Sequence, residues 1–170
     1  LIDWAAKTHQ QAVQILPIND TTITHTWMDS YPYNSISIYA FHPMYIDLNQ
    51  LGKMKDKEAL AVFEARRQEL NALPQIDYEA VNNAKRAYLK VMFQQTGRKV
   101  LASDEFKRFF EENEHWLLPY AAFSYLRDLY GTPDFSQWPE HTEYKAEEIA
   151  ALCAPDSSCY EEIAFYYYTQ

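Results

Sequence analysis

The stretch from Gln14 to Leu48, QILPINDTTITHTWMDSYPYNSISIYAFHPMYIDL, decides which fold the sequence predicts. A short apolar, β-branched run from Val13 to Ile18 opens it, Pro17 interrupts this run, and polar residues at 19–22 close it. Such a run is typical of a buried parallel strand that ends in a functional loop. Polar and aromatic residues follow directly, as they do where the loops of an α/β barrel converge on a ligand. The stretch therefore predicts a barrel strand and an active-face loop.

The sequence after Gly52 has the spacing of amphipathic helices. Apolar stripes predict one helix over residues 59–70 and another over residues 81–93, the second with Asp77 as its N-cap and Gly97 as its end. Four further helix signals follow: Ser103 as an N-cap, Pro119 in the first turn of a new helix that stops at Gly131, a short helix over residues 146–152, and a last helix opened by a capping box of Ser158 and Glu161.

These patterns together predict a mainly α-helical chain with a few short strands, that is, a partial (β/α)8 TIM-barrel piece plus an inserted helical subdomain. We expect residues 1–50 to form a barrel helix, a strand and the active-face loop, residues 51–145 the helical subdomain, and residues 146–170 the return to a truncated barrel helix. The chain starts inside one apolar pattern and stops inside another. It is therefore expected to be a piece of a longer protein.

The composition suits one soluble globular unit, and it agrees with a carbohydrate-binding role without proving one. Aromatic residues make up 16% of the 170 residues, and flat rings are what sugar faces pack against, although most rings in a protein belong to its core. A net charge of −9 argues against a nucleic-acid partner, which requires clustered Lys and Arg. No stretch approaches the roughly twenty apolar residues of a membrane span, and no leader is recognised. The cytoplasm is the default location.

Neither a metal nor a cofactor is predicted. The five histidines are scattered without a zinc-like spacing, and neither a phosphate-binding glycine loop nor a nucleophile elbow is present. The two cysteines, Cys153 and Cys159, are too few for a secreted disulfide scaffold. We expect reduced thiols rather than a bridge.

A series of short motifs runs along nearly the whole chain: Ile15-Leu16-Pro17, DSYPYNS at 29–35, FHPMYIDL at 41–48, FFEENEHWL at 109–117, PYAAF at 119–123, LRD at 126–128 and SQW at 136–138. In this order the motifs resemble those of the 4-α-glucanotransferases, the amylomaltase or disproportionating-enzyme family (glycoside hydrolase family 77). The first part is most similar to the type found as cytosolic disproportionating enzyme in plants and as a maltodextrin enzyme in gut bacteria.

The resemblance implies transfer of α-1,4-glucan segments between maltodextrins with retention. In this chemistry one carboxylate attacks the anomeric carbon and a second carboxylic acid protonates the leaving oxygen, with the two groups about 5 to 5.5 Å apart. No Asp or Glu of this chain matches the catalytic motifs of the family. Glu111, Glu112 and Glu114 form a cluster, but neighbouring positions on a helix point in different directions, which predicts a solvated surface. We expect no catalytic residue here and an inactive isolated chain.

The resemblance implies that this chain binds substrate. Tyr33 matches a family tyrosine that lies against the sugar, which makes it a wall of the donor subsite, and Asp29, Ser30 and Asn34 are the expected hydrogen-bonding partners beside it. The alternative for these polar residues is a turn-making role around the Pro at position 32. Trp27 is either a platform for a longer glucan or an anchor of the loop.

A second interpretation is a non-enzymatic helical module for carbohydrate binding or protein interaction, in which the polar loop is structural.

The predicted strand would also lack neighbours within this chain. Since an unpaired strand invites pairing with another copy, Ile15, Leu16 and Ile18 predict self-association.

Overall fold

The chain forms six α-helices and four 3-10 helices. The computed structural model describes residues 1–170. Its α-helices are α1 (Ile2–Lys7), α2 (Lys57–Asn71), α3 (Tyr78–Leu101), α4 (Asp104–Tyr130), α5 (Ala146–Leu152) and α6 (Tyr160–Tyr168), and its 3-10 helices are η1 (Trp27–Ser30), η2 (Pro43–Tyr45), η3 (Leu48–Leu51) and η4 (Phe135–Gln137).

The N-caps of α3 and α4 are those that the sequence predicts. The Asp77 carboxylate accepts a hydrogen bond from the backbone N–H of Ala80, and the Ser103 hydroxyl accepts one from Phe106. Each cap satisfies one of the donors that a helix start leaves unpaired. Gly131 ends α4 with a φ of 69°, a left-handed conformation that glycine adopts without steric cost.

Three predicted helix boundaries are wrong. Gly97 does not end α3, because the helix continues to Leu101 and this buried glycine leaves room for the ring of Phe93. Pro119 does not open a helix but lies inside the continuous α4. Ser158 does not form a capping box, since Cys159 is the N-cap of α6 and no side chain caps it.

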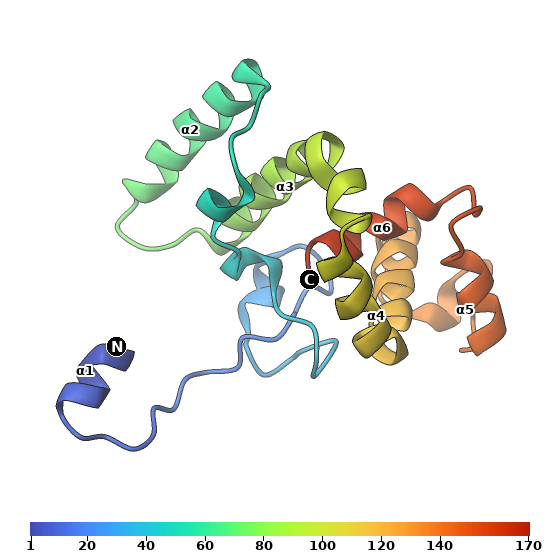
Figure 1. Ribbon diagram of the computed structural model, residues 1–170, viewed down its shortest axis with the longest axis horizontal. Coiled ribbons are helices and arrows are strands. Elements are labelled where there is room, and N and C mark those ends of the chain that lie inside the picture. The colour runs from blue at the N-terminus through green and yellow to red at the C-terminus, as the bar shows by residue number, and fades with distance from the viewer.

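The core lies where α3, α4 and α6 meet. Leu117 of α4 and Ile163 of α6 are fully buried, and Leu89 of α3 is 1% exposed. Burying an aliphatic side chain of this size contributes about 1.5–3 kcal/mol. In Figure 1, α6 runs between α3 and α4, while α5 covers the outer side of α4 and α2 packs against α3. The C-terminal helix is therefore the centre of the packing.

The expected barrel strand is wrong. No strand or sheet forms, and the one β-type pairing is an isolated antiparallel bridge between Asn19 and Phe41. Ile15 and Leu16 are 60% and 61% exposed, not buried. Pro17 has no N–H to donate, and within the run only Ile18 pairs with another segment, since its carbonyl oxygen accepts a hydrogen bond from the backbone N–H of His42 at 2.9 Å. The fold is helical and contains no strand of a TIM barrel.

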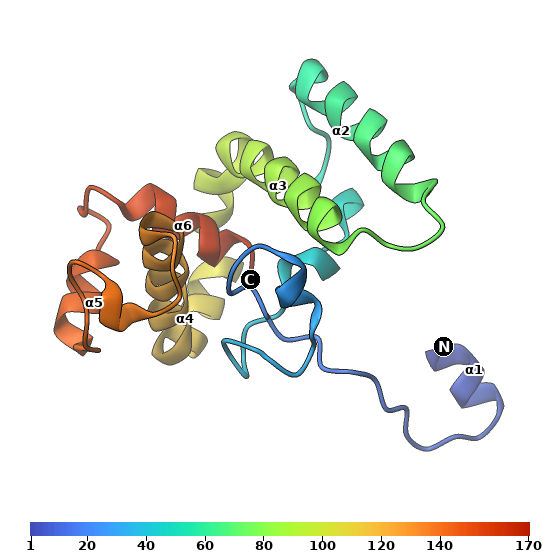
Figure 2. The ribbon, with the colours of Figure 1, turned by 180° about the vertical axis from the view of Figure 1, so that it is seen from behind.

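The N-terminal residues extend away from the helices. Figure 2 shows α1 separated from the other helices by a long extended segment. Only after this segment does the chain reach α3 and α4. Both cysteines are free thiols, as expected. None of the helices has the length and apolar composition that a membrane span requires.

Candidate functional site

The polar loop, residues 20–35, is fixed to α4 by buried hydrogen bonds. Asp20 is 2% exposed, and its carboxylate accepts hydrogen bonds from the Tyr120 hydroxyl at 2.6 Å and from the backbone N–H and hydroxyl of Thr22 at 2.9 and 2.6 Å. Arg127 Nη1 donates to the carbonyl oxygen of Thr22 at 2.5 Å. Burial, followed by the Asp20 charge, raises the pKa of Tyr120 well above its ordinary value, so this phenol stays a donor.

Asp29 braces the loop from within. Its carboxylate accepts hydrogen bonds from the backbone N–H of Thr24 at 3.0 Å and of His25 at 2.7 Å, and it is 3% exposed. His25 has a φ of 59°, which is uncommon for a residue with a side chain. The hydrogen bonds to Asp29 stabilise this conformation and so fix the shape of the loop.

Asp128 connects this loop to three helices. Its carboxylate accepts hydrogen bonds from His25 Nε2 at 2.7 Å, from Arg127 Nε at 2.9 Å and from the Tyr166 hydroxyl at 2.5 Å, and it pairs with Arg86 of α3. Burial would raise the pKa of Asp128, but the hydrogen bond from His25 and the positive charge of Arg127 outweigh it and hold this pKa well below its ordinary value. The group is therefore a carboxylate at neutral pH.

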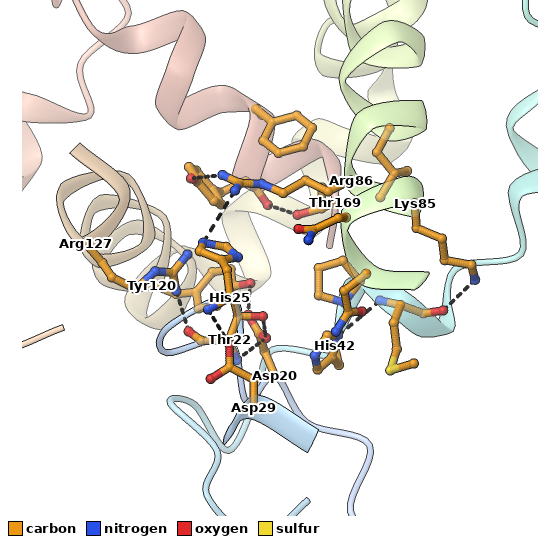
Figure 3. A pocket seen from close by; sticks show the side chains of 17 residues that line it. Asp20, Thr22, His25, Asp29, His42, Lys85, Arg86, Tyr120, Arg127 and Thr169 are labelled. Carbon is orange, nitrogen blue, oxygen red and sulfur yellow. Dashed lines mark hydrogen bonds between the residues drawn. The ribbon is translucent and has the colours of Figure 1, made fainter. Parts of the chain in front are cut away.

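A cavity of about 60 Å³ lies between the polar loop, η2 and the core helices. In Figure 3, Tyr120 and Arg127 lie on its left and His42 and Lys85 on its right. The Nζ of Lys85 is held at the edge of the cavity, because it donates to the carbonyl oxygens of Met44 at 2.5 Å and Ile46 at 2.9 Å. The labelled residues that line the cavity are Asp20, Thr22, His25, Asp29, His42, Lys85, Arg86, Tyr120, Arg127 and Thr169.

The residues that the sequence predicts to bind substrate differ in burial and do not form one group in the structure. Asp29 is buried and lines the cavity, where its hydrogen bonds match the turn-making alternative. Tyr33 is 64% exposed beside Tyr31, with ring centroids 5.5 Å apart. Trp27 is 50% exposed, and its ring lies 6.4 Å from that of Tyr78 at the start of α3. Ser30 is half-buried and Asn34 is exposed.

Trp27 also borders a surface hollow of about 420 Å³. Its other walls come from α2 and the first turns of α3, including Arg66, Asp77 and Asn83. An indole at the rim of an open hollow is accessible to a ligand from solvent. Trp27 is thus placed differently from Trp138, which is 5% exposed and packs against Phe123.

Sequence reasoning misses most residues of the site, among them His42, Arg86, Tyr120 and Asp128. Tyr120 meets Asp20, which lies 100 residues away, and Arg86 meets Asp128, which lies 42 residues away, so no local pattern reveals these pairs. His42, Tyr120 and Asp128 fall within motifs already noted, in the FHPMYIDL, PYAAF and LRD segments. No group of three or more His, Cys, Asp or Glu side chains is arranged to hold a metal ion.

Comparison with known proteins gives one consistent result. A family model described as 4-alpha-glucanotransferase, of glycoside hydrolase family 77, matches residues 1–170. The chain is 38% identical to the 4-alpha-glucanotransferase DPE2 of Oryza sativa subsp. japonica, over 100% of this chain and 18% of the rice protein. It is 31% identical to the 4-alpha-glucanotransferase of Chlamydia muridarum, over 100% of this chain and 31% of that protein.

A relative from Thermus thermophilus, also named 4-alpha-glucanotransferase, is 32% identical over 92% of this chain and 29% of its own length. The chain thus spans less than a third of the length of these curated relatives. No solved structure gives a significant match. Because the family model covers all 170 residues, this chain belongs to the 4-alpha-glucanotransferase family, glycoside hydrolase family 77.

Proposed function

We propose that this chain forms the donor side of the glucan-binding cleft of a 4-alpha-glucanotransferase, which transfers α-1,4-glucan segments between maltodextrins with retention. The observation that carries the proposal is the construction of the polar loop. Asp20, Asp29 and Asp128 fix its backbone through buried hydrogen bonds, while the rings of Tyr33 and Trp27 remain exposed. A rigid loop that presents aromatic faces suits a neutral sugar.

The rings supply affinity through apolar contact. Covering some tens of Å² of one aromatic face contributes roughly 1 kcal/mol at about 25 cal/mol per Å². Tyr33 is proposed as the wall of the donor subsite, and Trp27 with the hollow beside it as a platform for a longer glucan. Ser30 and Asn34 are proposed as hydrogen-bonding partners of sugar hydroxyls near Tyr33.

The catalytic carboxylates are proposed to come from outside these 170 residues. A retaining mechanism needs a nucleophilic carboxylate and a separate carboxylic acid. Asp20, Asp29 and Asp128 are all engaged by protein donors, so none is free to attack an anomeric carbon. The cluster Glu111, Glu112 and Glu114 is exposed on α4. The chain thus binds and orients the glucan but supplies neither group.

The location is proposed to be cytoplasmic. Two free thiols, one of them buried, support a reducing compartment. Separating cytosol from secreted fractions of the source cells and probing each for this chain tests the location.

The test of the function is Tyr33→Ala in the transferase that contains this chain. The rate of maltotriose disproportionation, measured as the release of glucose, is expected to fall at least severalfold because the donor glucose loses an aromatic wall. Tyr144→Ala is the matched control, since Tyr144 is 68% exposed near α5 and outside the polar loop. Full activity of the Tyr33 variant would overturn the site assignment.

A further inference from the structure

His42 is a buried donor that the fold leaves unpaired. The residue is 3% exposed and caps η2, and its Nδ1 accepts a hydrogen bond from the backbone N–H of Met44 at 3.1 Å. In a neutral imidazole the proton then sits on Nε2. Burial lowers the pKa of His42, against the opposing charges of Asp20 and Asp29, so the ring is neutral at pH 7.

The Nε2–H group has no protein partner. It is fully buried and unbonded, although His42 lines the cavity beneath the polar loop. The ring cannot turn easily to find an acceptor, because Tyr45 and Tyr78 pack edge-on to it with centroids 6.1 and 6.3 Å away. A held, buried N–H without a partner, on a residue that lines a cavity, is a group prepared for an external acceptor.

The remaining lining defines what that acceptor is. The cations Arg86 and Arg127 are paired with Asp128, and Lys85 is bound to backbone carbonyls. Two carboxylates, those of Asp20 and Asp29, also face the space. An anion would be repelled by these two carboxylates, since both arginines are already paired, and no metal cluster exists for a cation. The cavity therefore fits a neutral oxygen acceptor.

The size of the cavity limits the ligand further. A water molecule needs about 10–15 Å³ of such volume, so a space of about 60 Å³ holds a few water-sized groups. A whole sugar ring does not fit, but the hydroxyl edge of one ring does. The half-buried Asn82 also lines the cavity from α3 and offers both an amide donor and an acceptor.

We propose that this cavity is a hydroxyl-recognition pocket in which His42 Nε2–H donates to a hydroxyl oxygen of one glucose residue of an α-glucan. The inference rests on the proposed function and adds His42 as a specificity-determining residue. Apolar contact with Tyr33 accepts any sugar face, whereas a fixed N–H discriminates the position of a hydroxyl. A ligand that lacks this hydroxyl leaves the buried donor unpaired again.

The sharpest variant is His42→Asn. Asn is among the best N-cap residues, so it keeps the cap on η2, but its shorter side chain lacks the Nε2 donor. Maltotriose affinity, measured as the KM of the transferase that contains this chain, is expected to fall about three- to tenfold, the range of one neutral hydrogen bond. Ser124→Ala is the matched control, because Ser124 Oγ is also buried and unpaired but does not line the cavity. Its affinity is expected to be unchanged.

A second measurement detects the contact directly. In protein labelled with 15N-histidine, maltotriose is expected to shift the Nε2 resonance of His42. Inorganic phosphate at the same concentration is expected to leave the resonance unchanged. An unmoved resonance in the presence of saturating maltotriose would show that water alone occupies the pocket and would overturn the proposal.

The outcomes separate this inference from the function on which it rests. If Tyr33→Ala weakens maltotriose binding and His42→Asn does not, the hydroxyl pocket is overturned and the glucan site stands. If neither variant changes affinity, both are overturned. Weaker binding in both variants, with an unaffected Ser124→Ala, supports both.

Discussion

His25 Nε2 lies 2.7 Å from Asp128 Oδ1, although 103 residues separate the two in sequence. His25 is the residue of the polar loop with a left-handed backbone, and Asp128 is the α4 carboxylate that also binds Arg86 and Tyr166. The shape of the loop and the packing of α3, α4 and α6 are therefore set by one carboxylate. Replacing this carboxylate should therefore affect both the shape of the loop and the packing of the helices.

Asp128→Asn is expected to destabilise the chain by about 3 kcal/mol, because it leaves Arg86 and the buried Arg127 without a counter-charge. Urea unfolding followed by circular dichroism measures the change. Asp104→Asn at the start of α4 is the control, since that side chain is 95% exposed and its ion pair with Lys107 contributes at most about 1 kcal/mol. Equal effects of the two variants would contradict a structural role for Asp128.

The same carboxylate predicts a loss of stability in acid. The pKa of Asp128 is lowered in the fold from its ordinary value of 3.8. Its contribution is thus fully present above this value and is lost as the pH falls toward the folded pKa, since the unfolded chain binds the proton first. Unfolding free energies measured between pH 7 and pH 2 should decline more steeply below about pH 4 in the wild type than in Asp128→Asn. Parallel curves would argue against this assignment.

Local chemistry explains which features the sequence predicts. The caps Asp77 and Ser103 bond to backbone groups three residues away, so a short window contains both partners. The polar loop is recognised for the same reason, because its turn residues and rings are contiguous. By contrast, Tyr120 and Asp20, or Arg86 and Asp128, meet only through packing of distant segments.

The wrong strand has a related cause. The run Val13–Ile18 has the composition of a strand, but a strand exists only when a neighbour pairs with it, and composition does not reveal whether that neighbour lies in the same chain.

Gly97 is misread for a different reason. A glycine near the end of an apolar stripe resembles a helix end, yet here it makes room for a ring.

Gly97→Ala tests this packing role. A Cβ at this position would lie 2.4 Å from the Phe93 ring, which packs against Phe165 and Tyr168 of α6. The expected net effect is a destabilisation of about 1 kcal/mol, since the clash outweighs the gain of about 1 kcal/mol in helix propensity.

A double-mutant cycle with Phe93→Ala isolates the clash. In that background the ring is gone, so Gly97→Ala should become stabilising by about 1 kcal/mol through propensity alone. Chemical denaturation of the four chains supplies the numbers. A destabilising Gly97→Ala in both backgrounds would mean that the cost does not come from Phe93.

Self-association is the last prediction, and it survives the loss of the strand on which the sequence argument relied. We propose that the exposed N-terminal residues pair two copies of the chain. Trp4, Ile15 and Leu16 are each about 60% exposed on a segment that extends away from the core. Apolar area of this kind gains free energy when another copy covers it, at about 25 cal/mol per Å².

Light scattering should therefore give a mass above 20.0 kDa that rises with concentration. Changing Ile15 and Leu16 together to Ser is expected to return the monomer mass without loss of helix content, because neither side chain belongs to the core. Val62→Ser on α2, where the side chain is 72% exposed, is the control and should leave association intact. A monomer at every concentration would rule out pairing through this segment, and continued association of the Ile15 and Leu16 variant would assign it to another surface.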